Sequence, residues 1–351
     1  MNDVNRQWVV ARTSQSQGIG LERECFGRST GDIPTPADGE VLIRNVYFAC
    51  DPMNHAWVKG LEARFEPIPV GQAMKGGIAG RVVASRSERF AVGDAVTGFL
   101  DWADYVVCDG IDDTGTALQK LPPGADLASG LATLGMTGQC AYLGLADFGK
   151  PQPGETVVVS GAAGAIGTVA GQIARIQGAR VIGIAGGPQK CAMLKDQLQF
   201  EQTIDYKNEE VADRLAALCP EGIDVFFDNV GGPILDAALA NIAHGGRIVI
   251  CGGISGYNDE VPGLQNHLML AMRGAQMAGF FYFDYVHRFE EAAAQLNAWL
   301  REGKIQEVLD IAEGFDAAAD AALRQFAGGN TGKQLVKIAH DPHPGEPSTG
   351  L

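Results

Sequence analysis

The sequence lacks the features that mark secreted, disulfide-linked and nucleic-acid-binding proteins. Its first residues, "MNDVNRQWVVARTSQ", contain no apolar run of the kind that forms a signal peptide. Seven cysteines are scattered without a Cys-x-x-Cys pair, which is typical of free thiols in a reducing cytoplasm. The formal net charge is −15, and such an acidic chain disfavours binding to nucleic acid or to an anionic membrane.

Long charge-free runs are few, and neither of the two indicates a membrane span. Residues 127–146 and 156–174 carry no charged side chain, but both contain several Gly, Ser, Thr or Gln residues, so we interpret them as buried parts of a globular fold. A hydrophobic content of 46% and a charged content of 20% are ordinary for such a fold. A length of 351 residues exceeds what one core usually holds, so we expect two domains.

The pattern of secondary structure changes near residue 125. Before it, short β-rich segments such as "GEVLIRNVYFA" and "ADYVVCDG" are separated by turn clusters, which predicts a mostly β domain. After it, apolar strands alternate with helical patterns, which predicts a parallel sheet covered on both faces. We expect helices at 166–177, 189–200, 209–218, 234–243, 267–273, 288–301 and 317–326, and strands that include "QMAGFFYF" at 276–283 and "KQLVKIA" at 333–339.

The stretch "VVVSGAAGAIG" at 157–167 carries the chemistry of the second half. Gly161, Gly164 and Gly167 form G-x-x-G-x-x-G between a predicted strand and a predicted helix. Side chains are small there, so backbone N–H groups at a helix N-terminus could approach a dinucleotide phosphate. The alternative is a tight turn without a ligand.

The end of the next strand discriminates between the two nicotinamide dinucleotides. An NAD site places an acidic residue there for the ribose 2′-hydroxyl. In "AGGPQK" at 185–190, Gly186 and Gly187 take that place and the next charge is Lys190. This favours NADP(H), because a cation can pair with the 2′-phosphate; the alternative reading of Lys190 is a solvated residue of a helical turn.

A catalytic zinc is not expected. Cys50, Asp51 and His55 lie close together in the sequence, but a tetrahedral zinc needs three protein ligands. Where a zinc-type alcohol dehydrogenase supplies Gly-His-Glu, this chain has "GQA" at 71–73. The remaining histidines show no ligand spacing, so we predict no metal site.

Seven short motifs are spread over nearly the whole chain: "DPMN" at 51–54, "GGIAGRVVAS" at 76–85, "GAAGAIG" at 161–167, "FDNVGG" at 227–232, "CGGISGYN" at 251–258, "REGKI" at 301–305 and "GGNTGK" at 328–333. In this order and spacing they resemble the zinc-independent branch of the medium-chain dehydrogenase/reductases, and most of all the group of prostaglandin reductases (leukotriene hydroxydehydrogenases) and alkenal double-bond reductases. The resemblance implies a GroES-like catalytic domain from residues 1–125 and 310–351, with a Rossmann domain of residues 126–309 inserted into it. It also implies NADPH-dependent reduction of a carbon–carbon double bond conjugated to a carbonyl.

The resemblance also implies roles for individual residues. The pyrophosphate loop would be Gly164, Ala165, Ile166 and Gly167, and the 2′-phosphate contacts Gly186, Lys190 and Tyr206. The rest of the cofactor would be lined by Asn229, Cys251, Gly252, Ile254, Ser255, Tyr257, Phe280, Phe281, Tyr282 and Asn330. Asn229 and the 280–282 run have packing as their alternative role, although the carboxyl ends of parallel strands are where ligands bind such sheets.

Tyr257 resembles the family tyrosine whose hydroxyl stabilises the developing oxyanion, and its alternative role is that of a lid residue. One departure is Met53, which stands where the double-bond reductases have tyrosine and suits a different or broader substrate. The candidate functions are an enone or enal reductase, an NADPH:quinone reductase, and an NADPH-binding protein with little turnover. The family further suggests a homodimer formed through "QMAGFFYF".

Overall fold

The computed structural model describes residues 4–12, 21–60, 64, 66–256 and 262–341. The chain forms two compact units, Met1–Leu131 with Leu309–Leu351, and Ala132–Val308. The first break follows helix α2 (Leu127–Leu131), whereas the sequence placed it after residue 125. The difference arises because α2 is fully buried and packs with Val46, Ala79 and Leu335 in the core of the first unit.

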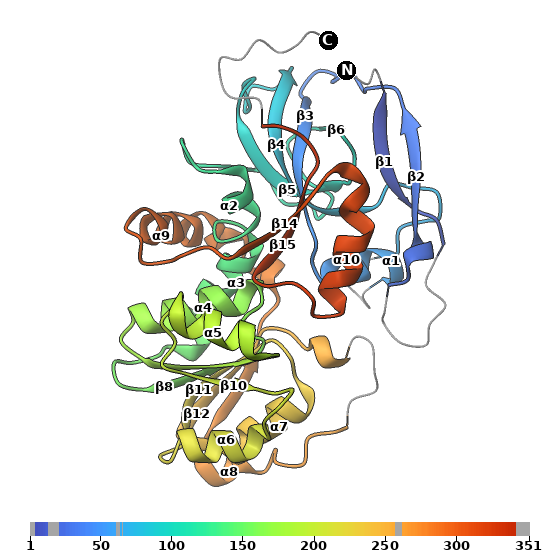
Figure 1. The fold of residues 1–351 in the computed structure, drawn as a ribbon. Coiled ribbons are helices and arrows are strands. Elements are labelled where there is room, and N and C mark those ends of the chain that lie inside the picture. Colours follow the sequence, from blue (N-terminus) through green and yellow to red (C-terminus); the bar gives the residue numbers. More distant parts are fainter. Residues whose placement is uncertain (1–3, 13–20, 61–63, 65, 257–261, 342–351) are drawn as a thin grey trace. The chain divides into compact units, whose positions relative to one another are not determined.

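The first unit is mostly β, as predicted. Its larger sheet has the order β14-β15-β3-β4-β5-β7 with β6 also paired to β3, and a separate two-stranded sheet joins β1 and β2 (Figure 1). Strand β15 pairs antiparallel with β3, so residues close to the C-terminus complete a sheet begun near the N-terminus. The strands are β1 (Asn5–Val10), β2 (Phe26–Gly31), β3 (Val41–Ala49), β4 (Lys75–Ser85), β5 (Ala95–Asp101), β6 (Tyr105–Cys108), β7 (Gln119–Lys120), β14 (Leu309–Glu313) and β15 (Lys333–Lys337), and the remaining helices are α1 (Met53–Lys59) and α10 (Ala318–Phe326).

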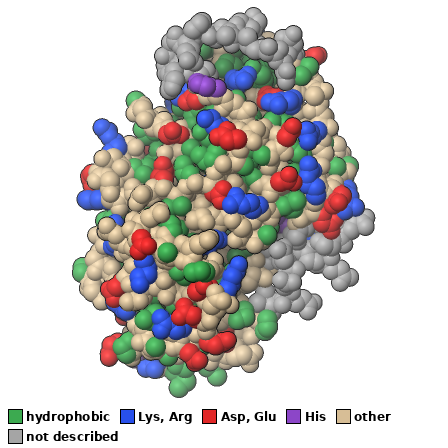
Figure 2. Space-filling model, viewed as in Figure 1, with side chains coloured by type: hydrophobic (Ala, Val, Ile, Leu, Met, Phe, Trp, Pro, Cys, Tyr) green, Lys and Arg blue, Asp and Glu red, His purple; other side chains and the backbone are tan. Residues whose placement is uncertain are grey.

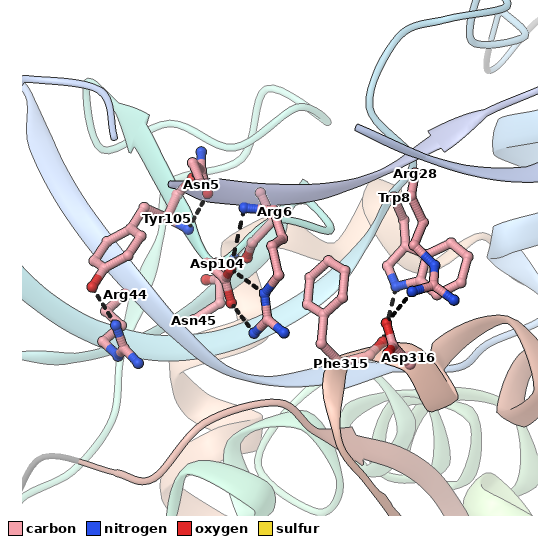
Figure 3. Close-up of polar contacts among 11 residues, drawn as sticks. Asn5, Arg6, Trp8, Arg28, Arg44, Asn45, Asp104, Tyr105, Phe315 and Asp316 are labelled. Carbon is pink, nitrogen blue, oxygen red and sulfur yellow. Dashed lines mark hydrogen bonds and ion pairs between the residues drawn. The ribbon is translucent and has the colours of Figure 1, made fainter. Parts of the chain in front are cut away.

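Side chains near the N-terminus also bind distant parts of the chain in this unit (Figure 3). Arg6 donates from Nε and Nη2 to the two carboxylate oxygens of Asp104, at 2.7 and 2.9 Å. The indole of Trp8 donates to the carbonyl of Phe315 at 3.0 Å, and the two rings stack at a centroid distance of 6.0 Å. Because Trp8 is fully buried, satisfying its N–H removes a cost that an unpaired buried donor would impose.

The second unit is the predicted doubly wound α/β fold. Its six strands are all parallel, in the order β10-β9-β8-β11-β12-β13, which is the order of a Rossmann dinucleotide-binding sheet. The strands are β8 (Thr156–Val159), β9 (Arg180–Ala185), β10 (Gln202–Asp205), β11 (Ile223–Asp228), β12 (Ile242–Ile250) and β13 (Gln276–Gly279). The helices are α3 (Met136–Leu143), α4 (Ala165–Ile176), α5 (Pro188–Asp196), α6 (Val211–Leu218), α7 (Gly232–Ala240), α8 (Met269–Arg273) and α9 (Phe289–Arg301).

Two expected elements end four residues earlier than the sequence suggested. Strand β13 ends at Gly279 and not at residue 283, because the rings of Phe280 and Tyr282 turn to pack on Phe148 and Phe289. Helix α5 ends at Asp196 and not at residue 200. Aromatic contacts therefore end β13, and a turn directly after Asp196 ends α5.

The two charge-free runs fold as separate short elements. The first contains α2 and α3, and the second contains β8 and most of α4. Within the described residues, no helix combines the length and the apolar character needed to cross a membrane. On the face drawn in Figure 2, Lys and Arg side chains alternate with Asp and Glu side chains, without a patch of one sign.

Candidate functional site

The turn between β8 and α4 leaves the first N–H groups of α4 available to an anion. Gly161 has a φ of +57°, and Gly164 is the N-cap of α4, so no side chain caps the helix. A Cβ on Gly167 would lie 2.4 Å from the carbonyl oxygen of Gly161, so only glycine allows this approach of helix and turn. The N–H groups of Ala165 and Ile166 therefore have neither an intrahelical partner nor a capping side chain.

The end of β9 faces the residue that follows β10. A Cβ on Gly186 would lie 2.9 Å from ring atoms of Tyr206, whose side chain is 47% exposed. Lys190 occupies the first turn of α5, two residues after Pro188. The structure thus brings Gly186 and Tyr206 together at the carboxyl edge of the parallel sheet, where such folds bind ligands.

A buried polar network joins β8 to the turn after β11. Ser160 donates through Oγ to Asp228 at 2.6 Å, and its Oγ accepts from the backbone N–H of Asn229 at 2.8 Å. The Asp228 carboxylate also accepts from the backbone N–H groups of Val230 and Gly231, at 3.1 and 3.0 Å. Burial raises the pKa of Asp228, while these donors counteract the shift. The network holds Asn229 at the strand end.

Asn229 carries an acceptor without a partner. Its Nδ2 donates to the carbonyl of Ser160 at 2.7 Å, but its Oδ1 is buried and accepts no hydrogen bond from the described residues. A buried, unsatisfied acceptor at the carboxyl end of a parallel strand fits a ligand that brings a hydrogen-bond donor.

The loop after β12 lies against this turn. Cys251 and Gly252 donate through their N–H groups to the carbonyl of Asp228, at 2.9 and 3.1 Å, and Ile254 donates to the carbonyl of Asn229 at 3.3 Å. Ser255 bonds to the carbonyl of Val230 through its N–H and its hydroxyl. The predicted residues 251–255 and Asn229 are therefore brought together, whereas Tyr257 lies outside the described residues.

The aromatic run at 280–282 serves packing in two of its three positions. Tyr282 is 8% exposed, its hydroxyl donates to Gln139 at 2.7 Å, and its ring stacks on Phe289 at 4.2 Å. Phe280 stacks on Phe148 at 5.6 Å. Phe281 is half-buried and contacts Phe283. These contacts fix the backbone that follows β13.

The first unit contains a buried ion pair beside two of the singled-out residues. The Nζ of Lys333 bonds to the Asp51 carboxylate, and their side chains are 3% and 7% exposed. Met53 begins α1 two residues after Asp51. Asn330 lies three residues before Lys333 and donates to the carbonyl of Gly332 at 2.8 Å. The pair ties the start of α1 to β15, and the role of Asn330 at the nicotinamide stays a prediction.

The donors near Cys50 do not fit a zinc ion. Burial and the Asp51 carboxylate raise the pKa of Cys50 well above its ordinary value, which disfavours the thiolate that zinc binds. The Asp51 carboxylate already pairs with the ammonium of Lys333. Across the described residues, three or more His, Cys, Asp or Glu side chains nowhere gather in a metal-binding arrangement.

Sequence reasoning did not single out the residues that hold the turns and loops of each unit in place. These are Ser160, Asp228 and Asp205, the last residue of β10, in the second unit, and Lys333 in the first unit. Ser160 and Asp228 stood inside or beside quoted motifs, but their partnership depends on β8 and β11 being neighbours. Their position at strand ends was the only available signal.

Comparison with known proteins places the chain in a family. Residues 165–298 match the family model described as zinc-binding dehydrogenase, and residues 6–116 match the N-terminal domain of oxidoreductase. The NADPH-dependent curcumin reductase of Escherichia coli (strain K12) is 36% identical, over 96% of this chain and 98% of that one. The NADP(+)-dependent 2-alkenal reductase of Nicotiana tabacum is 34% identical, over 86% and 88%.

A solved structure agrees with these relatives. CurA from Vibrio vulnificus in complex with NADPH is 38% identical and superimposes with a TM-score of 0.87, over 95% of this chain and 99% of that one. The chain belongs to the medium-chain dehydrogenase/reductases. Within that family it is an NADP-dependent oxidoreductase, related to the alkenal, curcumin and prostaglandin reductases.

Proposed function

We propose that this protein uses NADPH to reduce the carbon–carbon double bond of α,β-unsaturated ketones or aldehydes, without a metal ion. The observation that carries the proposal is the buried Oδ1 of Asn229, which has no partner among the described residues. It lies at the carboxyl edge of the parallel sheet, where the turn from β8 to α4 also leaves the first N–H groups of α4 uncapped. Relatives at 34% and 36% identity are named as alkenal and curcumin reductases.

The cofactor would be held along the carboxyl edge of the second unit. The N–H groups at the start of α4 would bind the pyrophosphate, and Gly186, Lys190 and Tyr206 the adenosine 2′-phosphate. Oδ1 of Asn229 would accept a hydrogen bond from the cofactor, and the 251–255 loop would line its nicotinamide half. Tyr282, whose hydroxyl is engaged with Gln139, would act by holding Phe280 and Phe281 in place.

When bound, NADPH supplies a hydride to the β-carbon of the substrate. The electrons of the C=C bond would then form the enolate double bond, the carbonyl π electrons would move onto the oxygen, and a proton from solvent would add to the α-carbon. The chain must therefore provide a donor for the developing enolate oxygen, which is the most effective kind of stabilisation for such a charge. We assign that donor to the hydroxyl of Tyr257. Met53 in place of tyrosine would leave an apolar, adaptable wall on the substrate side.

The test follows cofactor absorbance with purified protein and a panel of β-substituted enones, enals and quinones, with NADPH against NADH. We expect NADPH-selective turnover of enones to the saturated ketone, and a loss of about 10²-fold or more in kcat for Tyr257→Phe with KM for NADPH nearly unchanged. Tyr285→Phe is the matched control. Tight NADPH binding without turnover would contradict the proposal.

A quinone reductase is the second candidate, because quinone reduction needs the same cofactor but no proton delivery to carbon. It predicts turnover of quinones alone and no effect of Tyr257→Phe. The panel separates the two reactions within one set of assays.

We further propose a homodimer formed through β13. Within the described residues, this strand has a partner on one side only, and apolar side chains are exposed at and near it: Leu268 at 65%, Met272 at 74% and Met277 at 39%. Such an edge invites pairing with a second copy across a two-fold axis. Sedimentation should give twice the 37.0 kDa chain mass, and Met277→Lys should yield monomers; a monomeric wild type would contradict the proposal.

A further inference from the structure

Asp205 is the last residue of β10, and its carboxylate accepts hydrogen bonds from the two neighbouring turns. Oδ1 accepts from the backbone N–H of Gly187 at 2.7 Å and from that of Lys207 at 3.1 Å. Oδ2 accepts from Nδ2 of Asn208 at 2.7 Å. The bonds from Asn208 and Gly187 lower the pKa of the Asp205 carboxyl, so it stays ionised near neutral pH.

These bonds cross from one β–α connection of the sheet to the next. Gly187 is the N-cap of α5 with a φ of 97°. Glycine adopts this conformation at little cost, but it is free to adopt others, so a hydrogen bond is needed to hold it there. Tyr206 is held on the other side, where its N–H donates to the carbonyl of Ala185 at 3.2 Å. The carboxylate therefore sets the spacing between the Gly186–Gly187 turn and the Tyr206 turn.

We propose that Asp205 is a positioning residue for NADPH, which holds these two turns in the geometry that receives the adenosine 2′-phosphate. This inference rests on the proposed 2′-phosphate contacts of Gly186, Lys190 and Tyr206. A carboxylate beside a phosphate dianion is unfavourable unless its charge is neutralised by hydrogen bonds, and here three donors serve that purpose. The Asp205 carboxylate thus accepts hydrogen bonds from the protein and does not itself contact the proposed ligand.

The experiment compares Asp205→Ala with Asp205→Asn. Asparagine keeps an oxygen for the N–H groups of Gly187 and Lys207, and the Asn208 amide can turn to accept from the new Nδ2. We expect Asp205→Ala to raise the Kd of NADPH about tenfold, the order set by one or two lost hydrogen bonds, with a smaller change for NADH. Asp205→Asn should keep the wild-type ratio of the two Kd values.

Asp224→Ala is the matched control, because Asp224 lies near the amino end of β11 and accepts from the N–H of Thr156 at 2.8 Å. It should lower the melting temperature without changing the Kd ratio. Should Asp205→Ala fail to fold, Asp205→Ser gives the same test, since its hydroxyl is too short to bridge the turns.

Two outcomes would overturn the inference by itself. One is that Asp205→Ala leaves the ratio of the NADPH Kd to the NADH Kd unchanged while Lys190→Ala raises it, which would leave the 2′-phosphate site in place and remove Asp205 from it. The other is tighter NADPH binding by Asp205→Asn, which would show that the cofactor senses the charge. An unchanged ratio in Lys190→Ala as well would refute the 2′-phosphate site itself.

Discussion

The hydroxyl of Ser160 donates to the carboxylate of Asp228 at 2.6 Å, although the two residues are 68 positions apart in the chain. The bond joins the ends of two neighbouring parallel strands, and the same hydroxyl accepts from the N–H of Asn229. A single serine therefore satisfies a buried acid and fixes Asn229, whose buried Oδ1 accepts no hydrogen bond from the described residues. Loss of either partner should lower the free energy of unfolding and weaken cofactor binding.

Ser160→Ala removes a donor from Asp228 and an acceptor from Asn229. We expect the free energy of unfolding to fall by about 1–3 kcal/mol, the cost of buried groups left unpaired, and NADPH binding to weaken. Urea denaturation and fluorescence titration measure the two effects. Ser29→Ala, whose hydroxyl donates to Gln7 over a long 3.4 Å, should change neither; equal stability of both variants would refute the role of Ser160.

Breaking the Asp51–Lys333 pair should be costly because both side chains are almost fully buried. Asp51→Asn or Lys333→Met should each lower the free energy of unfolding by about 3–5 kcal/mol, since one charge is left without its partner. The double variant should lose less than the sum of the two. Glu302→Ala, which breaks an exposed pair with Lys304, should cost about 1 kcal/mol or less; strict additivity in the double-mutant cycle would contradict the coupling.

Gly186→Ala tests the contact with Tyr206. The new methyl group would lie 2.9 Å from the tyrosine ring, so the ring must move away from the proposed 2′-phosphate position. We expect KM for NADPH to rise about tenfold, equivalent to about 1.4 kcal/mol, with a smaller rise for NADH. Gly263→Ala, where the added methyl meets no atom within 4 Å, is the control, and a uniform loss for both cofactors would argue against a 2′-phosphate site.

His55 predicts a pH dependence of stability. Burial, with a smaller contribution from the charge of Lys59, lowers the pKa of His55 to about 4 from an ordinary value of 6.5. Between these values the unfolded chain binds the proton more readily, so stability is greatest above pH 6.5 and declines as the pH falls toward 4. His55→Gln should flatten this slope relative to wild type in denaturation series, and exposed His244→Gln should leave it; identical slopes would refute the assignment.

Much of the second unit was predictable because its signals are local. Strand–helix alternation gives a parallel sheet, and the glycines at 161, 164 and 167 mark the turn where α4 begins. The missing acid and the presence of Lys190 after β9 favoured NADP(H), in agreement with the NADP-dependent relatives. Each of these inferences needs only residues close together in the chain.

Other features depend on contacts that no short stretch contains. The strand expected at 276–283 ends at Gly279, because Tyr282 finds Gln139 and Phe289 as partners. The hydrophobic residues at 280–283 predicted a longer strand, but in the structure their aromatic contacts end the strand at Gly279.

The sequence by itself determined the order of the elements, the glycine-lined turn and the chemical class of the cofactor, since backbone conformation and charge act over a few residues. Only the tertiary structure decided which polar groups meet: Ser160 with Asp228, Asp205 with Gly187, and Lys333 with Asp51, the last pair 282 positions apart. Strand order sets these pairings, and strand order follows from packing the whole sheet.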